Sequence, residues 1–488
     1  MGLRSVEQYK ASLKDGRRVF FRGQSVPDVT EHPVIGVAVN HAAIDYRMAD
    51  DPVHRALSVV TQGEGAPYSR YYQLPATPDD LLKRSALIEA ATAEGGTLVV
   101  LIKEIGTDAL CGLLRVSESI DKKHGTTYHD RVKAFYRQCR DNDLAIAVAQ
   151  TDVKGDRSLA PSAQADPDLY VRIAGRRADG IVVSGAKAHT SVSTNANELI
   201  VLPTRAMAES DRDYAVSFAI PMNTPGLTLL ASAFDTTAAR QGSSIEYPIS
   251  ATHKMMETTT VFEDVFVPWD RVFMAGEWDF AGPLALAFVE HHRFTAISYK
   301  LPLVDAFVGC ALQMAQMNGI AKAGHARDKI TQLVGYAETL RGLTHYAAMR
   351  GTVREAGIMA PATLYVNMAK YHFAHHYHEA VRHVQDLAGG ALVTGPGAED
   401  LEVPETAKYY EKYYAGAGVG GRERLMALST VRNLVASEFS AYQEVLAVHA
   451  EGSLEAEKQM ILRSYDARPA LAFVKKLAAA GAAVSSTS

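Results

Sequence analysis

The sequence predicts an α+β protein with three consecutive parts: a helical N-terminal domain, a middle antiparallel β-barrel domain and a C-terminal helical bundle. Apolar residues recur at helical spacing up to about residue 145, and short β-rich runs separated by Gly, Pro, Asn and Asp follow up to about residue 280. Long helical patterns then return. A chain of 488 residues is also too long for one ordinary core. We therefore expect domains at residues 1–145, 146–280 and 281–488.

Helices of the first part are predicted by their ends as well as by their spacing. The stretch TPDDLLKRSALIEAATAEGG opens on a Thr suited to cap a helix, places acidic residues in the first turn and closes on Gly-Gly. DRVKAFYRQCRDND has the apolar spacing of a second amphipathic helix.

Strands of the middle part are short and are bounded by turn residues. LAIAVAQTDV, ELIVLPT and YAVSFAIPM are examples of such runs. RIAGRRADGIVV has turn chemistry between two alternating runs, which predicts a β-hairpin.

The last part consists of long apolar helical patterns, interrupted by the glycine-rich stretch LAGGALVTGPGAED. Such helices predict a bundle that buries one face within the subunit and another against copies of the same chain. The order helical, β, helical resembles the layout of the acyl-CoA dehydrogenase-like flavoproteins. This resemblance implies a flavin between the β domain and the C-terminal bundle.

Composition excludes several classes of protein. The net charge of −5 gives no reason to expect nucleic acid or an anionic membrane as a partner. Cys111, Cys139 and Cys310 are too far apart for a disulfide framework or a cysteine-ligated metal. The first residues carry charges throughout, unlike a signal peptide, and no apolar run reaches membrane-spanning length. A cytoplasmic protein is expected.

The stretch HHRFTAISYK, residues 291–300, lies near the start of a predicted long buried helix. Residues seven apart lie two turns apart on nearly the same face, so His292 and Tyr299 point the same way, with Lys300 beside them. Taken alone, these residues favour a core histidine with a lysine whose stem packs in the core. An acid–base role for His292 is the functional alternative.

Two polar turns of the β part are candidate cofactor sites. TDVKGDRS forms a tight turn with exposed donors, suited to a flavin ring edge or a pyrophosphate, from Thr151, Lys154, Gly155, Asp156, Arg157 and Ser158. In GAKAHTS, His189, Thr190 and Ser191 follow a glycine turn, where they are suited to hydrogen-bond a planar heteroaromatic ring. The alternatives are an ordinary charged turn and a strand end that bonds to itself. Neither turn is a GxGxxG phosphate loop.

Two carboxylates and one glycine loop complete the candidate residues. Glu257 directly precedes a β run, where burial would raise its pKa and suit it to acid–base work, although capping or a surface position is the plain alternative. Glu455 follows a long helix, and an acidic residue at a helix start is its alternative. Gln385, Gly389 and Gly390 belong to the loop QDLAGGALVTG, which allows close approach to a ligand or simply ends a helix.

Together these stretches resemble one family, the 4-hydroxyphenylacetate 3-hydroxylases and 4-hydroxybutyryl-CoA dehydratases. The resemblance runs from EQYKASLKDGRRVFFRG to HAEGSLEAEK, and TDVKGDRSLAPSAQADPDLYVRI and DGIVVSGAKAHTS look closer to the dehydratase branch. It implies FAD bound between the β domain and the helices of a homotetramer (a dimer of dimers), with some flavin contacts from neighbouring subunits. It also implies that His292, Lys300, Glu257 and Glu455 lie near the active site.

The sequence departs from the dehydratase pattern at the iron–sulfur cluster, which the family holds with three cysteines and one histidine. His292 matches the histidine ligand, but Tyr299 stands where one cysteine is expected and Thr107 where another is, leaving Cys111. A four-iron cluster requires about four protein ligands. The sequence therefore predicts a member with no iron–sulfur cluster and no other metal. Tyr299 would hydrogen-bond a substrate, donate a proton, or simply fill the vacated volume.

Three functions follow from the resemblance. The first is a two-component monooxygenase, in which FADH2 from a separate flavin reductase forms a C4a-hydroperoxide that hydroxylates a phenolic or other activated small molecule. The Arg and Tyr implied near the substrate of that branch are not evident in EIGTDALCGLL. The second is a cluster-free lyase or vinylacetyl-CoA isomerase that acts on an acyl-CoA. The third is a flavin-binding or purely structural homologue without catalysis.

Overall fold

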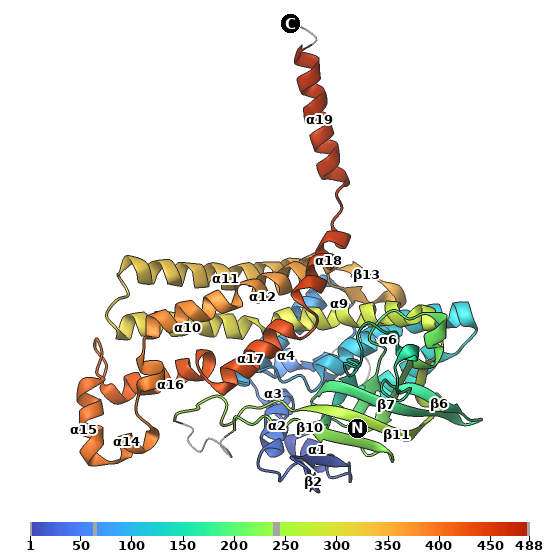
Figure 1. Cartoon of the computed structure of the whole chain (residues 1–488), viewed down its shortest axis with the longest axis horizontal. Helices are drawn as coiled ribbons and strands as arrows, with labels where there is room; N and C mark the ends of the chain where they lie inside the picture. Colours follow the sequence, from blue (N-terminus) through green and yellow to red (C-terminus); the bar gives the residue numbers. More distant parts are fainter. Residues whose placement is uncertain (1, 62–65, 238–244, 486–488) are drawn as a thin grey trace.

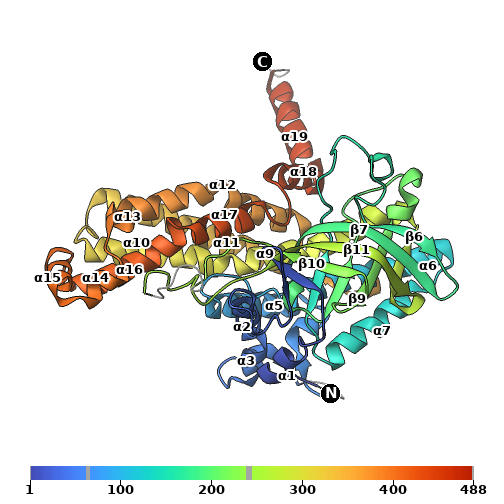
Figure 2. The same cartoon turned by 60° about the horizontal axis from the view of Figure 1, so that its bottom comes forward.

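The computed structural model describes residues 2–61, 66–237 and 245–485 (Figure 1). In both views the C-terminal helices α10, α11 and α12 lie at one end, the sheets lie at the other, and the helices α1–α3 lie beneath (Figures 1 and 2). The helix α19 projects away from the rest of the chain.

The N-terminal part is helical, as predicted, and its described residues also supply four short strands. Its elements are α1 (Val6–Ala11), β1 (Val19–Phe21), β2 (Gln24–Val26), α2 (Ile35–Ala42), α3 (Ile44–Asp50), α4 (Arg55–Ser58), β3 (Val59–Val60), β4 (Tyr68–Ser69), α5 (Pro78–Glu94), α6 (Glu104–His124) and α7 (Tyr128–Asp141). The predicted cap is confirmed: Thr77 and Asp80 form a capping box at the start of α5, and Gly95 caps its end. The second predicted helix is confirmed as α7.

The middle part contains eight strands among the described residues. They are β5 (Ile146–Ala149), β6 (Arg172–Arg176), β7 (Gly180–Ser191), β8 (Glu198–Val201), β9 (Val216–Pro221), β10 (Leu227–Ala231), β11 (Glu257–Pro268) and β12 (Val272–Ala275). The predicted hairpin is confirmed, because β6 pairs antiparallel with β7.

The strands do not form the predicted antiparallel barrel. Within the described ranges they make two open sheets, with orders β2-β1-β10-β11-β7-β6 and β12-β9-β8-β5. Each sheet also contains one parallel pair, β1 with β10 and β5 with β8. The parallel pairing of β1 with β10 could not be read from local turn chemistry, because it joins segments more than two hundred residues apart in the chain.

The C-terminal part is a helical bundle with one short strand pair. Its elements are α9 (Ala281–Tyr299), α10 (Leu301–Met317), α11 (Gly324–Met349), β13 (Thr352–Val353), β14 (Met359–Ala360), α12 (Thr363–Ala388), α13 (Ala391–Thr394), α14 (Ala398–Glu402), α15 (Pro404–Tyr413), α16 (Gly421–Val435), α17 (Glu438–His449), α18 (Leu454–Ser464) and α19 (Arg468–Ser485). β5 begins at Ile146 and α9 at Ala281, and the division into three domains stays a prediction.

The helix α9 lies between two apolar cores. Phe288, Ala296 and Tyr299 belong to a core shared with the sheets and the N-terminal helices. Phe294 and Ile297, on another face of the same helix, belong to the core of the C-terminal bundle. One face of α9 therefore packs against the sheets and the N-terminal helices, and another packs against the C-terminal bundle. This packing places α9 at the junction between sheet and bundle.

One stretch, residues 278–317, is long and apolar enough to cross a membrane by length and composition, contrary to the expectation from the sequence. Its most apolar window is 67% buried inside the structure. α9 and α10 account for most of it, and both contribute to the cores, which is typical of core helices in a folded domain.

Candidate active site

A cavity of about 850 Å³ lies at the junction of sheet and bundle. Its walls come from strands β7 and β11, helices α6, α9 and α17, and the segments that precede α6 and follow β5. Buried apolar side chains such as Val99, Leu101 and Val148 form one wall, and His292, Tyr299 and Glu451 line another part. The volume falls within the range of cofactor and small-molecule sites.

Seven of the predicted site residues lie at this cavity. His292 and Tyr299 line it from α9, and Glu257 lines it from the start of β11. Four of the predicted cofactor residues line it as well: Thr151, Lys154, His189 and Ser191. The structure therefore brings together the turn TDVKGDRS, the end of β7 and the helix of HHRFTAISYK. GAKAHTS was predicted as a polar turn, but it lies within strand β7.

Tyr299 and Lys300 both bind Glu451. Tyr299 Oη donates a hydrogen bond to Glu451 Oε1, and Lys300 Nζ lies 3.2 Å from Oε2. Lys370 Nζ, from α12, lies 3.7 Å from the same oxygen. Burial alone would raise the pKa of Glu451, but the charges of Lys300 and Lys370 bring it down to about 2. The pair of cations thus keeps a buried carboxylate ionised.

The structure places Glu455, the carboxylate predicted here, outside the cavity. Its side chain is 65% exposed on α18, where it pairs with Lys458 at 2.7 Å. Sequence reasoning missed Glu451, four residues earlier in the same stretch. Glu451 lies in the loop between α17 and α18 in the left-handed conformation, φ 61°, directly before Gly452 at φ 121°. An acidic residue directly before a glycine at a helix end was the available signal.

Glu257 is hydrogen-bonded across the cavity wall. Tyr442 Oη, from α17, donates to Glu257 Oε1 at 2.6 Å. Burial raises the pKa of Glu257, and the bond from Tyr442 offsets this only in part. In the sheet, Glu257 pairs with Ser191 of β7, so the start of β11 and the end of GAKAHTS lie side by side.

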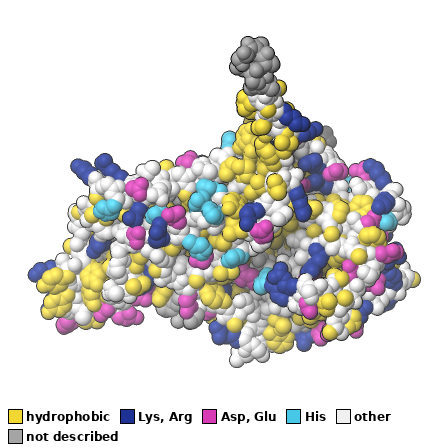
Figure 3. All heavy atoms as spheres, turned by 45° about the horizontal axis from the view of Figure 1, so that its top comes forward, with side chains coloured by type: hydrophobic (Ala, Val, Ile, Leu, Met, Phe, Trp, Pro, Cys, Tyr) yellow, Lys and Arg dark blue, Asp and Glu magenta, His cyan; other side chains and the backbone are white. Residues whose placement is uncertain are grey.

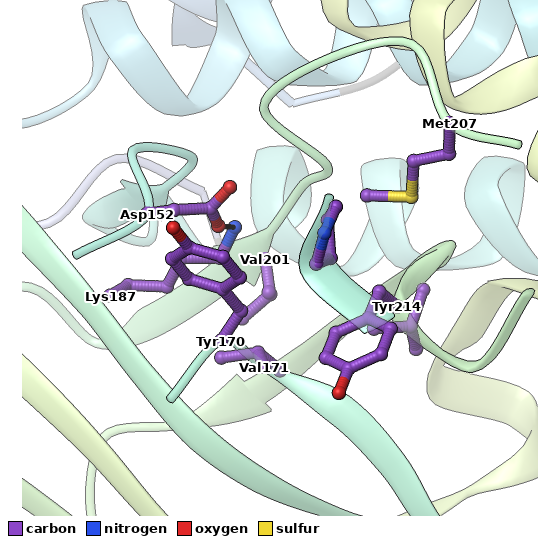
Figure 4. A pocket seen from close by; sticks show the side chains of 9 residues that line it. Asp152, Tyr170, Val171, Lys187, Val201, Met207 and Tyr214 are labelled. Atoms are coloured by element: carbon purple, nitrogen blue, oxygen red, sulfur yellow. Dashed lines mark hydrogen bonds and ion pairs between the residues drawn. The ribbon is translucent and has the colours of Figure 1, made fainter. Parts of the chain in front are cut away.

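A buried ion pair anchors the turn TDVKGDRS. Lys187 Nζ, on β7, donates to Asp152 Oδ1 at 2.6 Å (Figure 4). It also donates to the carbonyls of Gln150 and Leu202 at 2.8 and 3.0 Å. These contacts hold the start of the turn, so that Thr151 and Lys154 reach the cavity.

The remaining predicted cofactor residues do not line the cavity. Gly155, Asp156, Arg157 and Ser158 are exposed, and Asp156 bonds to Ser158. Thr190 is buried in β7 between two cavity-lining residues, and its hydroxyl has no partner among the described residues.

The loop of Gln385, Gly389 and Gly390 also lies away from the cavity of its own chain. Gln385 Nε2 donates to the carbonyl of Val435, and Gly389 caps α12. Lys370, which reaches Glu451, precedes the loop by about five turns of α12, or roughly 28 Å. A flavin contact from this loop to a neighbouring subunit stays a prediction.

Family profiles match nearly the whole chain. The profile of the 4-hydroxyphenylacetate 3-hydroxylase N terminal matches residues 5–274, and that of its C terminal matches residues 281–479. The chain belongs to the 4-hydroxyphenylacetate 3-hydroxylase family.

Relatives of this family member include two kinds of enzyme. It is 33% identical to a 4-hydroxybutyryl-CoA dehydratase/vinylacetyl-CoA-Δ-isomerase of Clostridium aminobutyricum, over 94% of the chain and 96% of the relative. It is 26% identical to the 4-hydroxyphenylacetate 3-monooxygenase oxygenase component of Thermus thermophilus, over 91% and 90%. This member of the family is therefore an enzyme.

Solved structures agree with this membership. An oxygen-tolerant archaeal 4-hydroxybutyryl-CoA dehydratase from N. maritimus superposes with a TM-score of 0.90 at 30% identity, covering 99% of this chain and 95% of that one. The oxygenase component of a 4-hydroxyphenylacetate 3-monooxygenase, complexed with FAD, superposes with 0.89 at 24%, covering 99% of both. A glutaryl-coenzyme A dehydrogenase gives 0.50 at 15% identity, covering 80% and 81%, so the acyl-CoA dehydrogenase-like fold is confirmed.

Two positions at which the resemblance to the dehydratase branch implies cluster cysteines, Thr107 and Tyr299, hold other groups here. Thr107 Oγ1 accepts a hydrogen bond from Arg84 at 2.8 Å and donates to the carbonyl of Lys103 at 2.9 Å, and Tyr299 bonds to Glu451. Within the described ranges, no three His, Cys, Asp or Glu side chains are grouped as metal ligands. The donors present do not fit an iron–sulfur cluster.

Proposed function

We propose that this chain is the oxygenase of a two-component monooxygenase, which hydroxylates a small phenolic substrate with FADH2 supplied by a separate reductase. The single observation that carries the proposal is the composition of the cavity. It has donors suited to a flavin on the β side and an acid–base group, His292, on the helical side. The relatives that are oxygenase components support the same reading.

Residues of the β side fit the flavin chemically. Lys154 supplies a cation, and Thr151, His189 and Ser191 supply hydrogen-bonding groups along one wall of the cavity. Thr190, beside them, carries a buried hydroxyl without a partner among the described residues. A solved relative of this fold is complexed with FAD. When bound, reduced FAD supplies the electrons that activate dioxygen.

Residues of the helical side act on the substrate. His292 accepts the proton of the substrate hydroxyl, and Tyr299, whose own hydroxyl donates to Glu451, lines the same cavity. Val99, Leu101 and Leu446 present apolar surface that excludes water from the ring.

The test is a turnover experiment with labelled oxygen. Purified protein is mixed with chemically reduced FAD, a panel of 4-substituted phenols and ¹⁸O₂. We expect a catechol that carries one ¹⁸O atom, while the other oxygen atom becomes water. The variant His292→Gln should lower the yield, whereas Glu455→Gln, on the surface, should not. Unlabelled or absent product would refute the proposal.

A second candidate is an isomerase that moves a double bond in an acyl-CoA. It is favoured by the presence of two acid–base centres on different walls, Glu257 with Tyr442 on one and His292 on the other. One would remove a proton from the carbon next to the thioester and the other would return one two carbons away. The 33% identity to the dehydratase/isomerase supports it too. Deuterium incorporation into vinylacetyl-CoA or crotonyl-CoA from D₂O, without any oxygenated product, would favour this candidate.

We also propose the assembly that the sequence predicts, a homotetramer in the cytoplasm that works with a flavin reductase. Mass measurement in solution, with and without the reductase, tests the assembly.

A further inference from the structure

The helix α6 presents a buried carboxylate to the cavity histidine. Asp108, in the second turn of α6, is 1% exposed, and its Oδ2 lies 3.2 Å from Nδ1 of His292. The imidazole of His292 also stacks on Phe288, with centroids 5.0 Å apart and planes at 13°. Two contacts of different kinds thus determine where this ring lies.

Two further groups hold the other oxygen of Asp108. Arg84 Nη2, from α5, donates to Oδ1 at 2.8 Å, and Thr295 Oγ1, one turn after His292, donates to it at 3.1 Å. Burial would raise the pKa of Asp108, but Arg84 and the bond with His292 bring it below its ordinary value. Asp108 is therefore an ionised carboxylate, which can only accept hydrogen bonds.

Arg84 is itself held in a single position. Its Nη1 donates to the carbonyl of Tyr71 at 3.0 Å, and its Nη2 also reaches Thr107 Oγ1 and the carbonyl of Glu104. Thr107 stands where the dehydratase branch implies a cysteine, and here its hydroxyl orients the arginine that holds Asp108.

The charged groups near His292 include two clusters and Arg293, which lines the same cavity. Asp108 with Arg84 lies on the side of α6, and Glu451 with Lys300 and Lys370 lies on the side of α12 and the loop after α17. The neighbouring His291 is buried, and burial lowers its pKa to about 3, so it adds no charge. In the described part of the chain, Asp108 is the only residue that is hydrogen-bonded to the imidazole of His292.

The acceptor character of Asp108 decides the state of the imidazole. Because Oδ2 cannot donate, Nδ1 of His292 must carry the hydrogen, and in the neutral ring Nε2 then carries the lone pair. Nε2 has no partner among the described residues, and His292 lines the cavity.

We propose that Asp108 is a positioning residue that makes His292 the base for the substrate hydroxyl, with Arg84 holding Asp108 in place. This inference rests on the proposed function. It names the residues that orient His292 for the proton transfer from the substrate. The proton of the bound hydroxyl moves to Nε2 of His292, the substrate becomes a phenolate, and the imidazolium is stabilised by the carboxylate of Asp108. No electron is transferred in this step.

The first experiment reads the proton transfer directly, without flavin. 4-Nitrophenol is the probe, because its phenolate absorbs at longer wavelength than its phenol. We expect the wild-type protein to bind the probe as the phenolate, and the variants His292→Gln and Asp108→Asn to bind it as the phenol. Thr295→Val, which removes one donor to Asp108 but leaves its charge, should keep most of the phenolate. Equal phenolate in wild type and Asp108→Asn would overturn the proposal.

A double-mutant cycle separates positioning from a merely structural role. Asp108→Asn should lower kcat about 10-fold to 100-fold with KM nearly unchanged. In the His292→Ala background the same substitution should have little further effect on kcat, because the group through which it acts is gone. Equal losses in both backgrounds would refute positioning. If the wild type binds 4-nitrophenol as phenolate but gives no hydroxylated product, the proposed function fails while the inference about Asp108 stands.

Discussion

At the scale of single residues, Glu451 holds together the buried charged groups beside the cavity. Its carboxylate is 3% exposed and is shared by Tyr299, Lys300 and Lys370. Burial lowers the pKa of Lys300 to about 7, so Lys300 depends on the negative charge of Glu451 to stay protonated. Buried charges of this kind are costly when one partner is removed, because the remaining ions keep their desolvation penalty.

The substitution Glu451→Gln should therefore destabilise the fold by about 3 to 5 kcal/mol. Differential scanning calorimetry measures the change. Glu455→Gln is the matched control, since that side chain is exposed in the same stretch, and it should change stability by less than about 0.5 kcal/mol. Similar small effects for both would show that Glu451 is not the counter-ion of the two lysines.

Glu457 gives a prediction about pH. Its side chain is buried, both of its oxygens lack hydrogen-bond partners among the described residues, and burial raises its pKa from 4.5 to about 7. The folded protein therefore binds this proton more tightly than the unfolded chain. The resulting stability is fully present below pH 4.5 and is lost as pH rises through about 7.

The wild type should lose up to about 3 kcal/mol of stability, relative to Glu457→Gln, between about pH 5 and about pH 8. Urea unfolding at several pH values measures the difference between the two proteins. Parallel pH dependence in wild type and Glu457→Gln would show that Glu457 does not titrate in this range.

At the scale of elements, sequence patterns predicted those helices and strands whose ends carry local signals. The cap at Thr77, the hairpin of β6 and β7 and the His292–Tyr299 face of α9 are determined by residues a few positions apart. The six-stranded sheet depends instead on the pairing of β1 with β10, and no local sequence pattern predicts that pairing. Glu451 and Asp108 were missed for the same reason, because their partners lie 152 and 184 residues away in the chain.

The loop between α17 and α18 is the element that carries Glu451, and Gly452 gives it its shape. A Cβ on Gly452 would lie 2.5 Å from Arg293 Nη2 and 3.3 Å from Glu457 Oε1, at a φ of 121° that side chains rarely adopt. Arg293 in turn donates to the carbonyl of Glu451 at 2.8 Å.

Gly452→Ala should therefore displace Arg293 and Glu451 together. We expect a loss of about 1 to 3 kcal/mol from crowding, in addition to the backbone cost, and a fall in kcat/KM. Gly418→Ala is the control, because its φ of 72° is also left-handed but nothing lies within 4 Å of its Cβ. Chemical denaturation of both variants measures the difference, and equal losses would contradict the contact argument.

At the scale of the whole molecule, α19 is the part that the single chain leaves unsupported. It projects from the body, and apolar side chains gather along it (Figure 3). Leu471, Phe473, Val474 and Leu477 are 59%, 61%, 61% and 56% exposed. Helices in proteins owe most of their stability to the packing of an apolar face, and exposed apolar surface of this extent marks an interaction site. A second copy of the chain is the occupant that fits the predicted homotetramer.

Removal of residues 465–488 should therefore reduce the molecular mass of the assembly, as measured by light scattering after size-exclusion chromatography. The truncated chain should still fold and should unfold at nearly the same temperature as the full chain. The reason is that none of the apolar residues named on α19 belongs to either core. The double variant Phe473→Lys and Leu477→Lys should have the same effect without shortening the chain. Val53→Lys, at a position 80% exposed on the N-terminal part, should leave the mass unchanged. If the full chain is monomeric at micromolar concentration, or if the truncated chain keeps its full assembly, then α19 does not hold copies together and its apolar side chains serve another contact.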